Sequence, residues 1–237
     1  MKSLIPAKRM FHISISLILV CLTILGSPLY AQMVLSDIIL DFENGKQLRR
    51  NVEVKNTGKE TLYISVTVNE VIKPGKTKLQ RRELKNPRTA SLLVSPKRMR
   101  LRPGQRRLLR VVVRKPAIKK DRIYHVTVKP VIGKVKSKQN MAVKIMIGYE
   151  MLVIVRPPNA KPRLRVRRSG KFLKFFNAGN TNVLLRRIRQ CNKNKSNCVD
   201  LPSKRIYAKQ RWKVKLPRKG PVEIVESVGL KHSIKEY

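Results

Sequence analysis

Apolar and polar residues alternate with a period of two along most of the first half of this chain, and segments with helical periodicity are scarce. Because successive side chains of a β-strand point to opposite faces, this alternation predicts half-buried strands. Turn signals such as Asn44-Gly45, Asn56-Thr57-Gly58 and Pro103-Gly104 separate the segments. The predicted strands cover residues 34–42, 50–55, 62–71, 92–95, 98–101, 107–114, 122–131 and 141–156. Seven or more strands with turns about every ten residues indicate an immunoglobulin-like sandwich.

A second set of strands follows a proline-rich connection that contains Pro157, Pro158 and Pro162. Proline restricts its own φ angle and the residue before it, so this connection is expected to be stiff. The strands predicted after it cover residues 164–167, 171–177, 183–190, 212–216 and 222–228. We therefore expect an all-β protein with two immunoglobulin-like domains, at residues 32–157 and 158–237.

The first 31 residues have the composition of a secretory signal peptide. Lys2, Lys8 and Arg9 form a basic start, residues 13–25 an apolar core, and Leu29-Tyr30-Ala31 a cleavage site. The alternative is a membrane anchor, but the apolar core is shorter than the roughly 20 residues that span a bilayer. Cleavage after Ala31 would send the mature chain to an oxidising compartment, the periplasm or beyond.

Removal of residues 1–31 leaves Cys191 and Cys198 as the only cysteines. An even count in an oxidising compartment predicts one disulfide bond across the polar turn between them. A metal site is the alternative, but it needs more ligands, and His125 and His232 are far away in sequence. We expect a disulfide and no metal or other cofactor.

The chain is strongly basic, with 55 lysine and arginine residues against 13 acidic residues and a net charge of +42. Such a charge attracts polyanions, including nucleic acid, lipopolysaccharide and acidic proteins. The basic residues alternate with apolar ones, as in Leu164-Arg165-Val166-Arg167, which is typical of the solvent face of a sheet. The aromatic residues form no stacking motif, so nucleic acid is not an expected partner.

No catalytic arrangement is evident in the sequence. His125 and His232 lie beside no nucleophile motif, the acidic residues are scattered, and there is no glycine-rich phosphate-binding loop. These observations favour a binding protein over an enzyme.

The segment that ends at Arg156-Pro157 has an apolar row at alternate positions: Met141, Val143, Ile145 and Ile147. Ala142, Lys144 and Met146 occupy the other face, so polarity fixes the register of this strand only weakly. An edge strand of this kind can pair with a strand of another protein. An internal strand of an ordinary sandwich would show the same period.

Several local patterns together resemble the periplasmic chaperones of the chaperone-usher pathway, which assemble bacterial fimbriae. They are the turn at Asn56-Thr57-Gly58, the segment 95–111 with its Pro-Gly turn, the long strand closing on Arg156-Pro157, and the turn at Asn177-Ala178-Gly179. Some members share the Cys191–Cys198 hairpin. The resemblance implies two immunoglobulin-like domains in a boomerang arrangement, with pilus subunits and an outer-membrane usher as partners, and without stable membrane insertion.

The resemblance also implies a donor strand that completes an unfinished pilus subunit. Its lent side chains would be Val143, Ile145 and Ile147, with Met141 extending the row. In the best-known members two cations hold the carboxyl terminus of the subunit, but the matching positions here are Ile39 and Leu152. Lys144 and Arg156 are the candidates to replace them, as in an alternative fimbrial class. The other function considered is an exported module that binds a polyanionic surface such as lipopolysaccharide.

Overall fold

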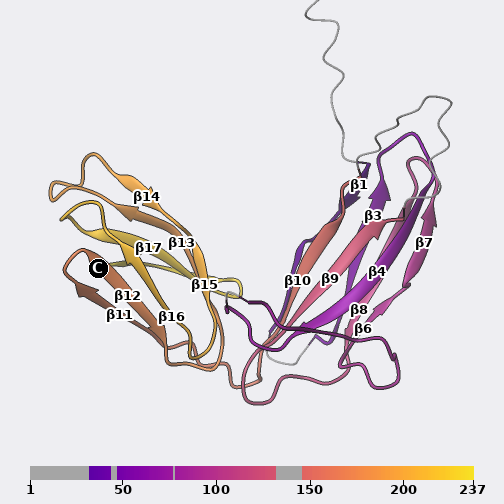
Figure 1. Ribbon diagram of the computed structural model, residues 1–237, viewed down its shortest axis with the longest axis horizontal. Coiled ribbons are helices and arrows are strands. Elements are labelled where there is room, and N and C mark those ends of the chain that lie inside the picture. The colour runs from indigo at the N-terminus through magenta and orange to yellow at the C-terminus, as the bar shows by residue number, and fades with distance from the viewer. Residues whose placement is uncertain (1–31, 44–46, 77, 132–145) are drawn as a thin grey trace, which may run out of the picture. The chain divides into compact units, whose positions relative to one another are not determined.

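The computed structural model describes residues 32–43, 47–76, 78–131 and 146–237, and within them the fold consists of two immunoglobulin-like β-sandwiches without helices (Figure 1). This confirms the predicted all-β class with two such domains. The predicted signal peptide, residues 1–31, lies outside the described residues. Around the predicted domain boundary, one strand ends at Val155 and the next begins at Leu164. The exact boundary at residue 157 stays a prediction.

The first sandwich packs a sheet of four strands against a sheet of six. The four-stranded sheet has the order β1 (Met33–Leu35), β3 (Arg49–Asn56), β8 (Arg106–Val113), β6 (Leu92–Ser95). The six-stranded sheet has the order β2 (Ile39–Phe42), β10 (Tyr149–Val155), β9 (Arg122–Pro130), β4 (Leu62–Val71), β5 (Arg81–Glu83), with β7 (Arg98–Leu101) also paired to β4.

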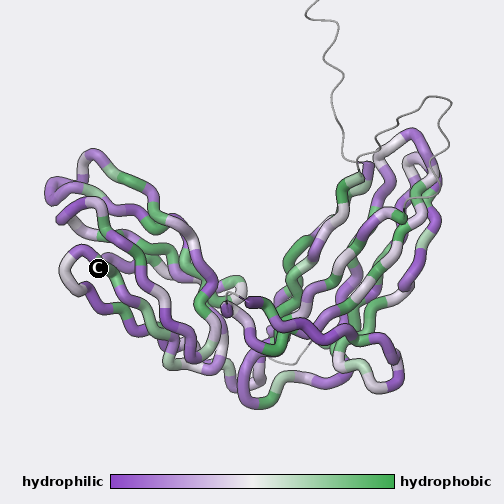
Figure 2. Tube along the Cα trace, viewed as in Figure 1, coloured by the Kyte–Doolittle hydropathy of each residue, from purple (hydrophilic) through white to green (hydrophobic). Residues whose placement is uncertain are grey.

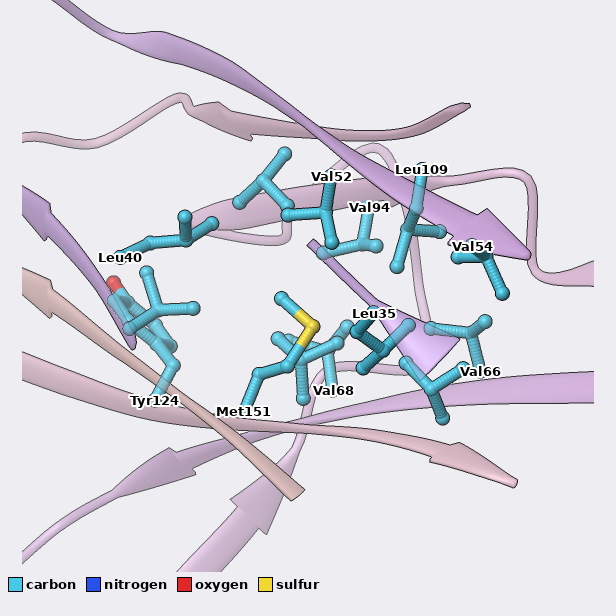
Figure 3. Close-up of a cluster of buried hydrophobic side chains, with 14 of the residues drawn as sticks. Leu35, Leu40, Val52, Val54, Val66, Val68, Val94, Leu109, Tyr124 and Met151 are labelled. Atoms are coloured by element: carbon cyan, nitrogen blue, oxygen red, sulfur yellow. The ribbon is translucent and has the colours of Figure 1, made fainter. Parts of the chain in front are cut away.

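The inner faces of these two sheets meet in one apolar core. Figure 3 shows Val52, Val54 and Leu109 of one sheet facing Val66, Val68 and Met151 of the other. Their outer neighbours along the strands are mostly polar, and Figure 2 shows the resulting alternation of hydrophobic and hydrophilic segments. The alternation in the sequence therefore indicates which face of each strand is buried.

The second sandwich is smaller. One sheet has the order β11 (Leu164–Ser169), β12 (Phe172–Asn177), β16 (Arg211–Lys215); the other has the order β14 (Val199–Leu201), β13 (Val183–Gln190), β17 (Val222–Val228), β18 (Lys231–Glu236), with β15 (Lys204–Ile206) paired to β13. Leu173, Phe175, Leu185 and Ile224 are among its buried core residues. The ring of Trp212 stacks on Phe175 with 5.1 Å between centroids, so this tryptophan packs against the core as its alternation predicts.

A disulfide bond joins Cys191 to Cys198, as predicted, and closes the turn between β13 and β14. It restricts the unfolded chain of a domain whose core is small.

The same buried asparagine corner occurs in both sandwiches. Asn56 donates to the carbonyl groups of Glu60 and Leu101 and accepts from the N–H of Gly58. Asn177 donates to the carbonyl groups of Thr181 and Ile206 at 2.7 and 3.0 Å and accepts from Gly179 N–H at 2.9 Å. Each fully buried side chain thus satisfies three backbone groups, two in the turn that follows it and one at the end of another strand.

We predict that Asn177→Ala destabilises the protein by about 3–5 kcal/mol, because two buried carbonyl groups and one N–H lose their partners. Denaturant unfolding measures the change. Asn194→Ala, in the exposed turn between β13 and β14, is the control and should change stability by less than about 0.5 kcal/mol. Equal effects of the two substitutions would contradict the structural role of the corner.

Candidate functional site

The two edges of strand β10 are paired to different extents. All seven residues of β10 pair with β9, from Tyr149 opposite Val128 to Val155 opposite Arg122. On the other edge, β2 runs parallel to β10 and pairs only with Leu152 to Val155. Within the described residues, the edge before Leu152 therefore has no neighbouring strand. We call this part of the strand, Tyr149–Met151, the open edge.

The open edge exists because the chain changes sheets just before β2. The sequence predicts one strand over residues 34–42, but the structure has two, and β1 pairs with β3 in the opposite layer. Ser36 makes the crossing: its N–H donates to Glu53 C=O, and its hydroxyl accepts from Glu53 N–H, both at 3.0 Å. The single predicted strand is wrong because these bonds hold the first half on the other sheet.

Exposed isoleucine side chains surround the open edge. Ile38 just before β2 is 54% exposed, Ile39 at its start is 48% exposed, and Ile147 before β10 is 51% exposed. Met151 and Val153 of β10 are buried, so the same alternation carried back along the chain would bury Ile147. Instead Met146 packs against the core and Ile147 does not, because residues 146–148 belong to no strand. The other members of the predicted donor row, Met141, Val143 and Ile145, lie outside the described residues.

Ile39 and Leu152, the two positions that the resemblance matches to anchoring cations, form an apolar pair. Leu152 and Ile39 are direct partners in the parallel register of β10 and β2. His125 lies opposite Leu152 on the other side, in β9. This part of the sheet surface therefore offers no lysine or arginine at these two positions.

The acidic residue of the open edge is neutralised by a neighbouring arginine. Glu150 accepts two hydrogen bonds from Arg81, at 2.7 and 3.1 Å. His125 Nδ1 lies 2.8 Å from Glu150 Oε1. Burial lowers the pKa of His125, and Arg81 adds to this, although Glu150 opposes both. Burial thus favours the neutral imidazole, and the Arg81–Glu150 pair leaves little net charge beside the open edge.

Arg156, one of the two candidate anchors, is buried and fully engaged. Its side chain is 3% exposed, and its Nε and Nη2 each donate to a carboxylate oxygen of Asp41 at 2.8 Å. Nη1 donates to the hydroxyl of Thr181 and to Asn182 C=O. A foreign carboxylate could bind this guanidinium only by displacing Asp41. Lys144, the other candidate, lies outside the described residues.

The Arg156 cluster extends through Asn182. The backbone N–H and side-chain amide of Asn182 both donate to Asp121 Oδ2 at 2.6 Å, and its side-chain oxygen accepts from Arg205. Burial raises the pKa of Asp121, although the bonds from Asn182 and Thr181 oppose the shift. The contacts of Asn182 with Asp121 and Arg205 join residues 61 and 23 positions apart in the chain, so no local sequence pattern could reveal them.

Other kinds of site are not evident in the described part of the chain. There, no three histidine, cysteine or acidic side chains are grouped closely enough to hold a metal ion. Among the same residues, no helix has the length and hydrophobicity to cross a membrane.

A family model described as the pili and flagellar-assembly chaperone, PapD N-terminal domain, matches residues 32–161. This range includes both sheets of the first sandwich and the whole of β10. The chain belongs to the PapD-like family of assembly chaperones. The resemblance noted from the sequence is thereby confirmed, and the protein is a fimbrial assembly chaperone by family.

Solved structures of fimbrial chaperones have the same fold. The class 5 fimbriae chaperone CfaA is 22% identical, with a TM-score of 0.62, and the match covers 86% of this chain and 98% of that one. The SafB chaperone of Salmonella enterica, solved with the SafA pilin, is 16% identical at a TM-score of 0.64, covering 89% and 98%. CsuC of Acinetobacter baumannii, solved with CsuE, is 16% identical at 0.58, covering 87% and 98%. A comparison with curated proteins finds no match.

We predict that Arg156→Met lowers stability by about 3–5 kcal/mol, because Asp41 would remain largely buried without its partner. Adding Asp41→Leu should restore part of the loss, since no uncompensated charge is then left. Urea unfolding of the single and double variants measures both effects. Arg189→Met removes an exposed ion pair with Asp200 and is expected to cost less than about 1 kcal/mol. A loss for Arg156→Met as small as that of the control would refute a structural role for this arginine.

Proposed function

We propose that this chaperone binds an incomplete pilus subunit by adding its own strand, residues 141–147 continuing into β10, to the sheet of the subunit. It would hold the subunit in the periplasm and pass it to an outer-membrane usher, which replaces the lent strand. The observation that supports this most strongly is the open edge of β10. No enzymatic step or cofactor is part of the proposal.

Strand addition is chemically suited to this edge. Backbone N–H and C=O groups that lack a neighbouring strand form hydrogen bonds with any extended chain laid beside them, whatever its sequence. Specificity then comes from alternate side chains that enter pockets of the partner. Met141, Val143, Ile145 and Ile147 are spaced for that task, and the exposed Ile38 and Ile39 add apolar surface at the start of β2.

The apolar row is large enough to give useful affinity. Burial of each of the four side chains contributes about 1.5–3 kcal/mol, or roughly 6–12 kcal/mol in total. Ordering of the two strands and coupled folding of the subunit offset much of this gain. Binding of intermediate strength suits a chaperone that must later release its subunit.

Similar proteins support the nature of the partner. SafB and CsuC were each solved as a complex with a protein of their own pilus system, a pilin and a tip subunit respectively. We infer that this chain likewise binds pilus subunits. For the carboxyl terminus of the subunit, Lys144 is the better of the two proposed anchors, because Arg156 is already bound to Asp41.

We predict that Ile145→Asp weakens binding to a pilus subunit at least a hundredfold, because a carboxylate would enter an apolar pocket without a partner. Co-purification from the periplasm with the pilin-like proteins of the same organism gives the measurement. Ile118→Asp is the matched control, since Ile118 is 81% exposed between β8 and β9. Melting temperatures of the free variants test whether both still fold.

Normal capture of subunits by a folded Ile145→Asp variant would place the lent strand elsewhere and overturn the proposal. Equal loss of capture in the Ile118→Asp variant would also count against it, because the effect would then follow from added charge rather than from the donor row.

A further inference from the structure

The outer face of the β11–β12–β16 sheet is a grid of basic residues. Three strands in register place Arg165, Phe176 and Arg211 in one row, and the rows that follow contain Arg167, Lys174 and Lys213, then Ser169, Phe172 and Lys215. All six cations are exposed. We call this surface the basic face; from strand spacings it measures about 10 by 14 Å.

Acidic residues are excluded from this sheet. The second domain has four of them, and all lie on the other sheet: Asp200 on β14, Glu223 and Glu226 on β17, and Glu236 on β18. None of the six cations of the basic face forms an ion pair within the described part of the chain. The acidic residues of the second domain are therefore confined to one of its two sheets.

Such an arrangement is unfavourable for the free protein. Arg167, Lys174 and Lys213 are direct cross-strand neighbours, and like charges placed directly opposite each other destabilise a sheet. In the first domain, by contrast, Arg82 and Arg122 share a counter-charge, because both donate hydrogen bonds to Glu70. Clustered cations without counter-charges indicate that the basic face meets an anionic surface.

Two phenylalanines lie among the cations. Lys213 Nζ is 5.3 Å from the ring centroid of Phe172, and the guanidinium of Arg211 is 4.7 Å from that of Phe176. Phe172 faces away from the core and is 36% exposed. Phenyl rings flanked by basic residues are typical of surfaces that rest on a lipid bilayer, where the rings reach the acyl boundary and the cations meet phosphate groups.

We propose that the basic face docks the protein peripherally on an anionic phospholipid membrane. A sheet face of this size can lie against the plane of headgroup phosphates, and no membrane-spanning segment is required. The inference is independent of strand donation, because the basic face and the open edge of β10 belong to different sheets of different sandwiches.

The test is co-sedimentation of the full mature chain with vesicles of phosphatidylcholine alone and with phosphatidylglycerol added. Wild type should bind only the anionic vesicles, and binding should weaken steeply as salt rises. The triple variant Arg167→Gln, Lys174→Gln, Lys213→Gln should bind about a hundredfold more weakly, since each basic residue near an anionic surface contributes about fivefold.

A matched control removes the same charge from the other sheet and its turns: Lys193→Gln, Lys204→Gln, Lys231→Gln, all at exposed positions. It should retain binding within a fewfold of wild type. Phe172→Ser should weaken binding without changing its salt dependence, because it removes only the apolar contact.

Absence of wild-type binding to phosphatidylglycerol vesicles would overturn the proposal, and so would equal losses in the two triple variants. Retention on heparin or on an acidic protein, without vesicle binding, would assign the basic face to a different polyanion and equally refute a lipid partner. Capture of pilus subunits can be measured on the same variants, so failure here is distinguishable from failure of strand donation.

Discussion

Hydrogen-bond pairing of the β10 backbone is the constraint on which the proposed activity of this chaperone depends. One edge is bonded to β9 along its whole length, and the other meets β2 only from Leu152 onward. The reason lies upstream, at Ser36, where the chain leaves one sheet for the other. A strand that is firmly held on one side and unpaired on the other is suited to lending that second side to a partner.

Rigid polar contacts hold this strand in place. Arg156 follows β10 directly and binds Asp41 of β2. This contact fixes the parallel pair of β10 and β2 at the end away from the open edge. Tyr149 donates its hydroxyl proton to Met33 C=O, which ties the start of β10 to the opposite sheet. Binding geometry built on well-supported strands is more accurate than geometry built on loops. The open edge would therefore need little rearrangement to pair with a partner strand.

Alternation of apolar and polar residues was sufficient to predict the fold class, most strands and the core-facing role of Trp212, and an even cysteine count predicted the disulfide. The break between β1 and β2 left no clear signal in the sequence: the buried positions change from Met33 and Leu35 to Leu40 and Phe42, but Val34, Ile38 and Ile39 between them are apolar and exposed. The pairs Arg81–Glu150 and Arg156–Asp41 join residues 69 and 115 positions apart and left no local pattern. The basic face likewise becomes visible only when the register aligns β16 with β11 and β12.

Amide hydrogen exchange of the chaperone, alone and bound to a purified pilus subunit, tests the central claim most directly. If the chain lends a strand at the open edge, amides from residue 141 to Met151 become protected on binding, whereas those of β18, the edge strand of the second sandwich, exchange as before. Unchanged exchange in that segment, with protection appearing at β18 or another edge, would contradict strand donation by β10.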